Sequence, residues 1–583
     1  MKADVGLWLL IGAFTLALTW LLTNHHPPYL SFHSDAWVAL IFILIAAGVA
    51  FFGPKEVRWH YVQAVSLALA LVPLVQVAIG IQFFVGTAWV SILYVLGFAL
   101  AVQLGARSEQ LDSDWLIDLL FLGIGIASIA SVGVQFYQWL GYTNTDGIAD
   151  IWVLHLIGSR PYGNIGQPNQ LASLLLWGIL AGGWGIQRGA IRLRVGILYW
   201  AFLLFGLALT QSRMAWLAVA MLTAATWYWR ALWPSKRVPL WTSLGALFFL
   251  LATLSIEPLS RLMVTAASPD LGARVTANFP IRPAVWAMYL ESMLDRPWLG
   301  YGWGQLLTAQ VNMLVDHPVV HGLLHSHSHN LFLDLIIWNG FPIGLLVSGL
   351  LLFWVFRSVR SVAQSGDAIL LMAILAIGLH AMLELPLHYA YFLLPTGVFV
   401  GVLNERLGFR VAFQTSRWVL VVLLCASTVM FGLVVRDYFR IESAYFDLRF
   451  ELNRVGTNHP TEPPDVLLLT QLREQIRYAR FEPHERMTDE QVEWARNITS
   501  LYPNTAGLLK LVKVLVLNDR RDEAAIWLRR ICPIVSASQC IAAEYAWKQA
   551  QEEDARLAIL PWPKGCLRGQ CRGLENASSV GEG

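Results

Sequence analysis

The sequence predicts an all-α polytopic membrane protein, and three observations support this prediction. Of its 583 residues, 56% are hydrophobic and only 14% are charged, against about 25% charged in soluble globular proteins. The mean hydropathy is +0.54. Apolar stretches long enough to span a bilayer recur along the chain. A soluble enzyme and a disordered chain are therefore excluded, and a formal net charge of +2 gives no general attraction to nucleic acid.

About thirteen apolar stretches are candidates for spanning helices, within a range of about twelve to fourteen. Backbone groups in lipid must be hydrogen-bonded within their own segment, so these stretches form helices rather than strands. The first lacks a small-residue cleavage site, and we interpret it as an anchor and not as a signal peptide. The stretches centre on Leu16, Leu44, Ala70, Leu96, Ile124, Leu176, Phe202, Ala220, Ala246, Leu346, Ala376, Phe399 and Ala426.

Charge divides the chain into two parts. Residues 436–583 hold 41 charged residues, whereas the much longer segment 1–435 holds 39. We therefore expect a transmembrane domain over 1–435 and a water-soluble domain over 436–583.

Basic residues predict the orientation, because they favour cytoplasmic connections. They gather in alternate connections, with Arg160 and Arg213 as the exceptions. This pattern places the N-terminus in the cytoplasm and, with thirteen spans, the C-terminal domain in the periplasm. The basic residues concerned are Lys55, Arg58, Arg107, Arg188, Arg192, Arg194, Arg230, Lys236, Arg237, Arg357, Arg360, Arg406, Arg410 and Arg417.

The C-terminal domain contains four of the five cysteines, namely Cys532, Cys540, Cys566 and Cys571. An even set on the outer side of the membrane favours two disulfides in any of three pairings. A zinc site is the alternative, although no CxxC spacing is present. The stretch 504–531 has apolar stripes on either side of a polar turn. It predicts a helical hairpin like one tetratricopeptide unit, which serves either as a cap or as a docking platform.

The long outward connection, roughly 257–330, contains five histidines in "DHPVVHGLLHSHSHN". A neutral imidazole at the edge of a membrane cavity suits a general base. Metal binding is the alternative, but Pro318 interrupts the spacing, and Asp316 and Asp334 are the only acids nearby. His329 directly precedes Asn330 and an apolar helix, so it lies at a helix start, where a capping role is also open.

Two further clusters suggest chemistry. Arg160, Arg213 and Arg282 lie at membrane boundaries, where arginine is costly and indicates function. Guanidinium forks match phosphate oxygens, which suggests a lipid diphosphate, with snorkelling to ordinary lipid phosphates as the alternative. Glu384 and His388 lie between two predicted spans, where the acid pairs with an arginine, orients an imidazole or belongs to a structural buried pair.

These motifs resemble a known superfamily. "HSHNLFLDLIIWNGFPIG", "LTQSR" and "RPAVW" followed by "RPWLGYGWG" are similar to the motifs of the O-antigen ligase and polymerase superfamily. "HHPPYLSFHSDAWVA", "RPYGNIGQPNQLA", "HAMLELPLHYAYFLLP" and "DYFRIESAYFDLRF" resemble its pilin-type bacterial O-oligosaccharyltransferases, the PglL type. The resemblance extends to about residue 450.

The resemblance implies a multi-pass protein of the bacterial inner membrane, with packed helices similar to C-type glycosyltransferases. It implies transfer of a preassembled glycan from undecaprenyl diphosphate to a serine or threonine of a periplasmic protein, often a type IV pilin. It implies no nucleotide sugar, metal or other cofactor. His329 matches the essential histidine, and Arg213 and Arg282 match the arginines assigned to the diphosphate, which we extend to Arg160.

The remaining candidates bind the glycan or support the site. Neutral amides both donate and accept hydrogen bonds, which suits sugar hydroxyls. These candidates are Gln167, Asn169, Gln170, Trp286, His327, Asn330, Glu384, His388 and Tyr389.

Three other functions stay open. An O-antigen ligase performs the same chemistry on a lipid A core sugar, but the charged tail favours a protein acceptor. A polymerase joining two lipid-linked repeats is a close variant. A transporter of polyprenyl-linked glycan predicts inverted repeats and charges at the membrane midplane, which the sequence does not display.

Overall fold

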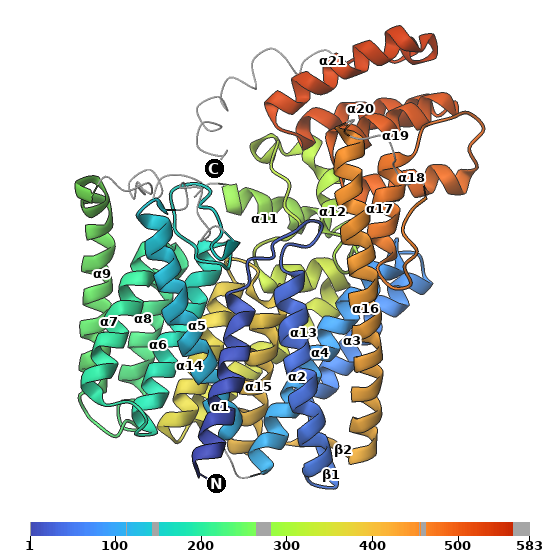
Figure 1. The fold of residues 1–583 in the computed structure, drawn as a ribbon. Coiled ribbons are helices and arrows are strands. Elements are labelled where there is room, and N and C mark those ends of the chain that lie inside the picture. The colour runs from blue at the N-terminus through green and yellow to red at the C-terminus, as the bar shows by residue number, and fades with distance from the viewer. Residues whose placement is uncertain are drawn as a thin grey trace.

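The computed structural model describes residues 2–111, 114–142, 151–263, 281–453, 455 and 462–563, and this part of the chain is mostly α-helical (Figure 1). Each of the thirteen predicted centres lies inside a different helix. These helices are α1 (Lys2–Ala17), α2 (Phe32–Phe52), α3 (Tyr61–Ala78), α4 (Val85–Gln110), α5 (Trp115–Trp139), α6 (Pro168–Gln187), α7 (Leu193–Leu209), α8 (Arg213–Tyr228), α9 (Val238–Met263), α13 (Leu331–Ser361), α14 (Ser365–Ala381), α15 (Ala390–Arg406) and α16 (Arg417–Leu452).

Seven helices of the described chain are long and apolar enough to cross a membrane: α2, α3, α4, α5, α9, α13 and α16. The share of the apolar window that is buried in the protein ranges from 11% in α16 to 56% in α5. The prediction of a polytopic helical membrane protein is therefore confirmed. The most buried helices, α6, α14 and α15, form the centre of the largest core with α5.

The described strands form one small sheet between helices. Strand β1 (Glu56–His60) pairs antiparallel with β2 (Val411–Ser416), with Glu56 opposite Ser416. The sheet lies at the same end of the helical body as the start of α1, whereas the C-terminal helices lie at the opposite end (Figure 1). These two ends carry different polar clusters.

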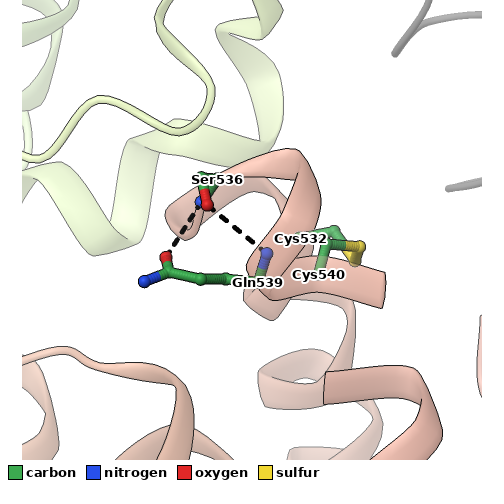
Figure 2. The surroundings of a disulfide bond; sticks show 4 residues. All are labelled: Cys532, Ser536, Gln539 and Cys540. Atoms are coloured by element: carbon green, nitrogen blue, oxygen red, sulfur yellow. Dashed lines mark hydrogen bonds between the residues drawn. A yellow bond between two sulfur atoms is a disulfide. The ribbon is translucent and has the colours of Figure 1, made fainter. Parts of the chain in front are cut away.

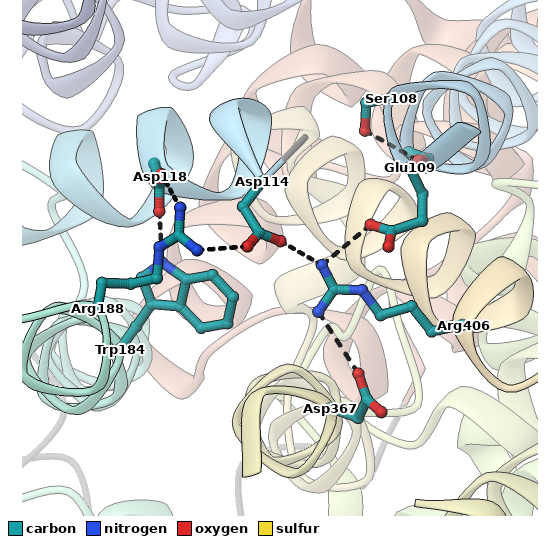
Figure 3. Close-up of polar contacts among 9 residues, drawn as sticks. Ser108, Glu109, Asp114, Asp118, Trp184, Arg188, Asp367 and Arg406 are labelled. Carbon is teal, nitrogen blue, oxygen red and sulfur yellow. Dashed lines mark hydrogen bonds and ion pairs between the residues drawn. The ribbon is translucent and has the colours of Figure 1, made fainter. Parts of the chain in front are cut away.

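The cluster at the sheet end is built around Arg406, the last residue of α15 (Figure 3). Its guanidinium contacts the carboxylates of Glu109, Asp114 and Asp367, the last at 3.4 Å. Arg188 extends the cluster by pairing with Asp114 at 2.7 Å. The cluster joins the ends of α4, α6, α14 and α15, so we interpret it as structural.

The C-terminal helices gather at the other end (Figure 1). They are α17 (Thr470–Arg480), α18 (Asp489–Leu501), α19 (Thr505–Leu517), α20 (Arg521–Ile534), α21 (Ala537–Glu553) and the short η7 (Ala555–Ile559). The predicted hairpin is present as α19 and α20. Asn504 and Ser536 cap α19 and α21 with their side chains, as residues of this type do at helix starts.

One disulfide of the described chain joins Cys532 to Cys540 across the turn between α20 and α21 (Figure 2). This bond pairs two of the four predicted cysteines, while Cys566 and Cys571 lie outside the described residues. Cys425 is free and exposed on α16.

The predicted loop 257–330 and the C-terminal domain, or tail, share one hydrophobic core. This core runs from α11 (Ile281–Ser292) and α12 (Leu306–Met313) through α13 into α18–α21. The Gly322 amide of the loop donates to the Pro533 carbonyl of the tail at 2.9 Å. Two predicted boundaries fall inside helices: α9 continues to Met263, and α16 continues unbroken across residues 435 and 436.

Candidate functional site

Glu384 is the centre of a polar cluster at the end of the helical body opposite the sheet. We call this end, where the C-terminal helices lie, the tail end. It lies between α14 and the short helix η6 (Pro386–His388). Its carboxylate accepts from Arg282 Nη2 at 2.8 Å and from Asn169 Nδ2 at 3.3 Å, and it contacts His329 Nδ1 at 3.1 Å. The Glu384 side chain is 11% exposed. Three segments far apart in sequence therefore meet at one carboxylate.

His329 occupies an unusual backbone position at this carboxylate. Its φ is +58°, in the left-handed region that few residues other than glycine adopt. The following residue, Asn330, caps α13 by accepting from the Leu333 amide. Such backbone outliers cluster at functional sites, where the surrounding structure holds them in place. Because Nδ1 faces Glu384, Nε2 is the ring nitrogen that stays open to a reacting group.

The loop that carries His329 is held by hydrogen bonds to its backbone. Tyr289 Oη donates to the His325 carbonyl at 3.0 Å, and Trp286 Nε1 donates to the Ser328 carbonyl at 2.8 Å. Gln310 Oε1 accepts from the His325 amide at 2.9 Å. Asp334, in the first turn of α13, accepts from the Ser328 amide at 2.8 Å. These contacts fix the loop independently of its own side chains.

Arg282 reaches Glu384 from the start of α11. With Trp286 and Tyr289 it occupies positions i, i+4 and i+7, which share one face of a helix. This face of α11 therefore serves both the carboxylate and the His329 loop. The Arg282 side chain is 37% exposed, so part of its guanidinium is open to a ligand.

The predicted arginines Arg160 and Arg213 occupy different positions. Arg160 Nε donates to the Thr210 carbonyl at 2.8 Å, and Arg160 Nη2 donates to Asn169 Oδ1 at 3.3 Å. Arg213 begins α8 and is exposed, with no hydrogen bond or ion pair to any described residue. Ser212, which precedes it, donates to Asn169 Oδ1 at 2.7 Å. Asn169 thus links the segments that carry Arg160 and Arg213 to Glu384 through hydrogen bonds.

The other predicted residues lie around this cluster. Gln167 is half-buried at the start of α6, and Gln170 is buried, accepting from Tyr391 Oη at 2.7 Å. Tyr389 stacks on Tyr391. His327 and His388 are in edge contact, with ring centroids 4.1 Å apart.

Ionisation in the cluster follows from burial and neighbouring groups. Burial raises the pKa of Glu384, but its hydrogen bond with His329 and the charge of Arg282 outweigh burial, so its pKa lies below the ordinary value. Burial, reinforced by His329, lowers the pKa of His325 and of His388 to about 4. At neutral pH the Glu384 carboxylate is therefore ionised, and the imidazoles of His325 and His388 are neutral.

Three family models match successive parts of the chain. A model of protein glycosylation ligases matches residues 161–184, the O-antigen ligase model matches 198–348, and a model of the C-terminal part of virulence-factor membrane-bound polymerases matches 369–548. Two curated proteins of Acinetobacter baylyi are each 26% identical to the chain. They are a general O-oligosaccharyltransferase, aligned over 89% of this chain and 90% of that protein, and a ComP-specific O-oligosaccharyltransferase, aligned over 68% and 70%.

The chain is an O-oligosaccharyltransferase, and its sequence is similar to the PglL type of the O-antigen ligase superfamily. The transferase builds its polar cluster from all three matched parts, since Asn169 comes from the first, Arg282 and His329 from the second, and Glu384 from the third. These residues meet only in the folded chain.

Tyr289, Gln310 and Ser212 were not recognisable as parts of the site from the sequence. The helical spacing of Tyr289 from Arg282 was a usable signal. Gln310 and Ser212 gave none, because a single amide or hydroxyl is common in any loop or helix and its partner lies elsewhere in the chain.

Proposed function

We propose that this transferase moves a preassembled oligosaccharide from undecaprenyl diphosphate to a serine or threonine hydroxyl of a periplasmic protein, in the first instance a type IV pilin. The observation that carries the proposal is the meeting of His329 and Arg282 at Glu384. A base and a phosphate-binding cation beside one another suit displacement of a diphosphate by a hydroxyl.

The bond-forming step is a direct inverting displacement. The acceptor hydroxyl oxygen attacks the anomeric carbon, and the bond from that carbon to the diphosphate oxygen breaks. The hydroxyl proton passes to His329 Nε2, while Glu384 holds Nδ1 and stabilises the imidazolium that forms. An acid that orients a histidine and balances its charge has this role in the Ser-His-Asp sites of hydrolases.

The departing diphosphate gains negative charge as the bond breaks. Arg282 is partly exposed next to the base, and Arg213 offers a guanidinium without a protein partner among the described residues. Guanidinium groups bind phosphate oxygens bidentately, so these two arginines hold the leaving group. Arg160 and Asn169 position the segment before Arg213, and Gln167 contacts the glycan.

The tail end of the helical body faces the periplasm in this proposal, within the bacterial inner membrane. Two features support the orientation. The sheet end carries basic residues such as Arg58, which favours the cytoplasm. The Cys532–Cys540 disulfide belongs to the tail end, and disulfides persist in oxidising compartments.

The test is a reconstitution with purified components. The chain in lipid nanodiscs receives undecaprenyl-diphosphate-linked oligosaccharide and a pilin, without nucleotide or ion gradient, and peptide mass spectrometry follows the intact glycan. We expect glycosylated serine or threonine with wild type and none with His329→Ala. Unmodified pilin in a preparation that binds the donor would contradict the proposal.

A parallel reaction with lipid A core as acceptor tests the second candidate, an O-antigen ligase. The match of the O-antigen ligase model to residues 198–348 favours testing it. Glycan transfer to lipid A core but not to pilin would replace the proposed acceptor and leave the chemistry unchanged.

A further inference from the structure

We infer that His327, Asp334 and His388 form a binding site for a divalent transition-metal ion such as Zn²⁺, beside the proposed catalytic cluster. One donor atom of each residue lies within 4.8 Å of the other two. The three residues come from separate elements: the loop before α13, the first turn of α13, and η6.

One polar atom of this trio lacks the partner that burial demands. His327 Nδ1 is buried and has no hydrogen-bond partner. Asp334 is 2% exposed, and no lysine or arginine in the described part of the chain pairs with it. Buried carboxylates are normally paired or bound to a metal, and an unsatisfied buried polar group points to an ion or water at that place.

The donor set selects the class of metal. Two imidazoles and one carboxylate match the His₂-carboxylate sites of zinc proteins, which keep further positions open. Calcium and magnesium prefer sites made of oxygen ligands alone. The Ser328 amide donates to Asp334 Oδ1 at 2.8 Å, so the backbone orients this carboxylate, as outer-shell hydrogen bonds do in metal sites.

The ion would hold two segments of the chain together and would take no part in the transfer reaction. His327 lies two residues before His329, and His388 lies four residues after Glu384. A metal that binds both would tie the His329 loop to the segment of Glu384. The site stands apart from the proposed transfer reaction, because binding is measurable without any glycan.

The experiment measures metal content of the full chain. The protein is purified with a tag free of histidine from cells grown with added Zn²⁺, and bound metals are determined by inductively coupled plasma mass spectrometry. We expect one Zn²⁺-class ion per chain in wild type. His388→Ala and Asp334→Asn should fall to background, whereas His325→Ala, a histidine of the same loop outside the trio, should retain the ion.

A second measurement keeps the inference falsifiable if a variant misfolds. Chelator-treated wild-type protein is titrated with Co²⁺, whose visible absorption reports nitrogen and carboxylate ligation of low coordination number. A saturable band at one equivalent that excess Zn²⁺ abolishes is expected. Metal in wild type no higher than in His388→Ala, together with no Co²⁺ band, would overturn the inference, whatever the outcome of the transfer assay.

Discussion

The two ends of the helical body carry polar clusters of opposite design. At the sheet end, Arg406 is surrounded by three carboxylates (Figure 3). At the tail end, Glu384 is approached by Arg282, His329 and Asn169. The two clusters are separated by the length of α15, whose 17 residues span roughly 25 Å.

The difference lies in what each cluster leaves open. The Arg406 side chain is 16% exposed, and its neighbours include another ion pair, so its charges satisfy one another. The groups around Glu384 remain partly accessible to a ligand, since the side chain of Arg282 is 37% exposed and that of His329 is 25% exposed. A cluster that is satisfied internally holds helices together, whereas a cluster with open donors and an open ring nitrogen can bind and react.

The same helices carry both clusters. α6 places Asn169 at one end and extends to Arg188 just beyond the other, and α14 and its flanking residues do the same with Glu384 and Asp367. The sheet-end cluster therefore stabilises the same helices that carry the groups at the tail end. Four variants test this division of roles, in order of their expected effect on transfer.

His329→Ala should have the largest effect. Loss of a general base lowers the rate by roughly 10²–10⁴-fold, while the protein still inserts and binds the lipid-linked glycan. Single-turnover transfer with prebound donor measures the step directly. Near-normal transfer would remove His329 from the reaction and leave the tail-end cluster without a base.

Glu384→Gln should lower kcat by about 10²-fold, because the amide neither holds the imidazole as firmly nor stabilises its charged form. KM for the donor should change little. The ratio of the two constants, measured with Glu384→Asp as the conservative comparison, checks this. A change confined to KM would instead make Glu384 a binding residue.

Arg282→Ala should weaken donor use by about tenfold or more, because charge-assisted hydrogen bonds to the diphosphate are lost. Arg282→Lys should restore activity only in part, since lysine keeps the charge but not the fork. Donor titrations with both variants measure this, and full recovery with lysine would indicate simple charge attraction.

Arg406→Ala should have the smallest effect on transfer and a clear effect on stability. Removing one partner of a largely buried ion cluster costs about 3 kcal/mol, seen as a lower thermal midpoint in detergent. Transfer per folded molecule should stay within about twofold. Arg188→Ala is the matched control, because its guanidinium is 44% exposed and exposed pairs contribute roughly 1 kcal/mol or less. A loss of transfer without loss of stability would contradict the structural role.

Much of the fold was predictable because it depends on local chemistry. Each of the thirteen predicted helix centres lies in a helix, and the hairpin at Asn518 is present, since apolar length and turn residues act within one segment. Helix ends were less predictable. The i,i+4 pair between Glu257 and Arg261 lies in the last turns of α9, within residues that the hydrophobic pattern had assigned to a loop.

The candidate site was predictable as a set of residue types but not as a geometry. His329, Arg282 and Glu384 were each singled out, yet the sequence left open whether Glu384 pairs with an arginine or orients an imidazole, and the structure has it do both. The local spacing of the histidine run argued against a metal. The inferred site takes His327 from that run and combines it with His388 from a distant segment, which no local spacing can reveal.

Apolar length, charge distribution and capping residues by themselves determined that this chain crosses a membrane as helices and ends in a charged helical domain, because these properties act over short stretches of sequence. Only the tertiary structure decided which side chains meet. The contacts at Glu384, the trio of His327, Asp334 and His388, and the core shared by the loop and the tail all join residues distant in sequence, and their distances depend on how whole helices pack.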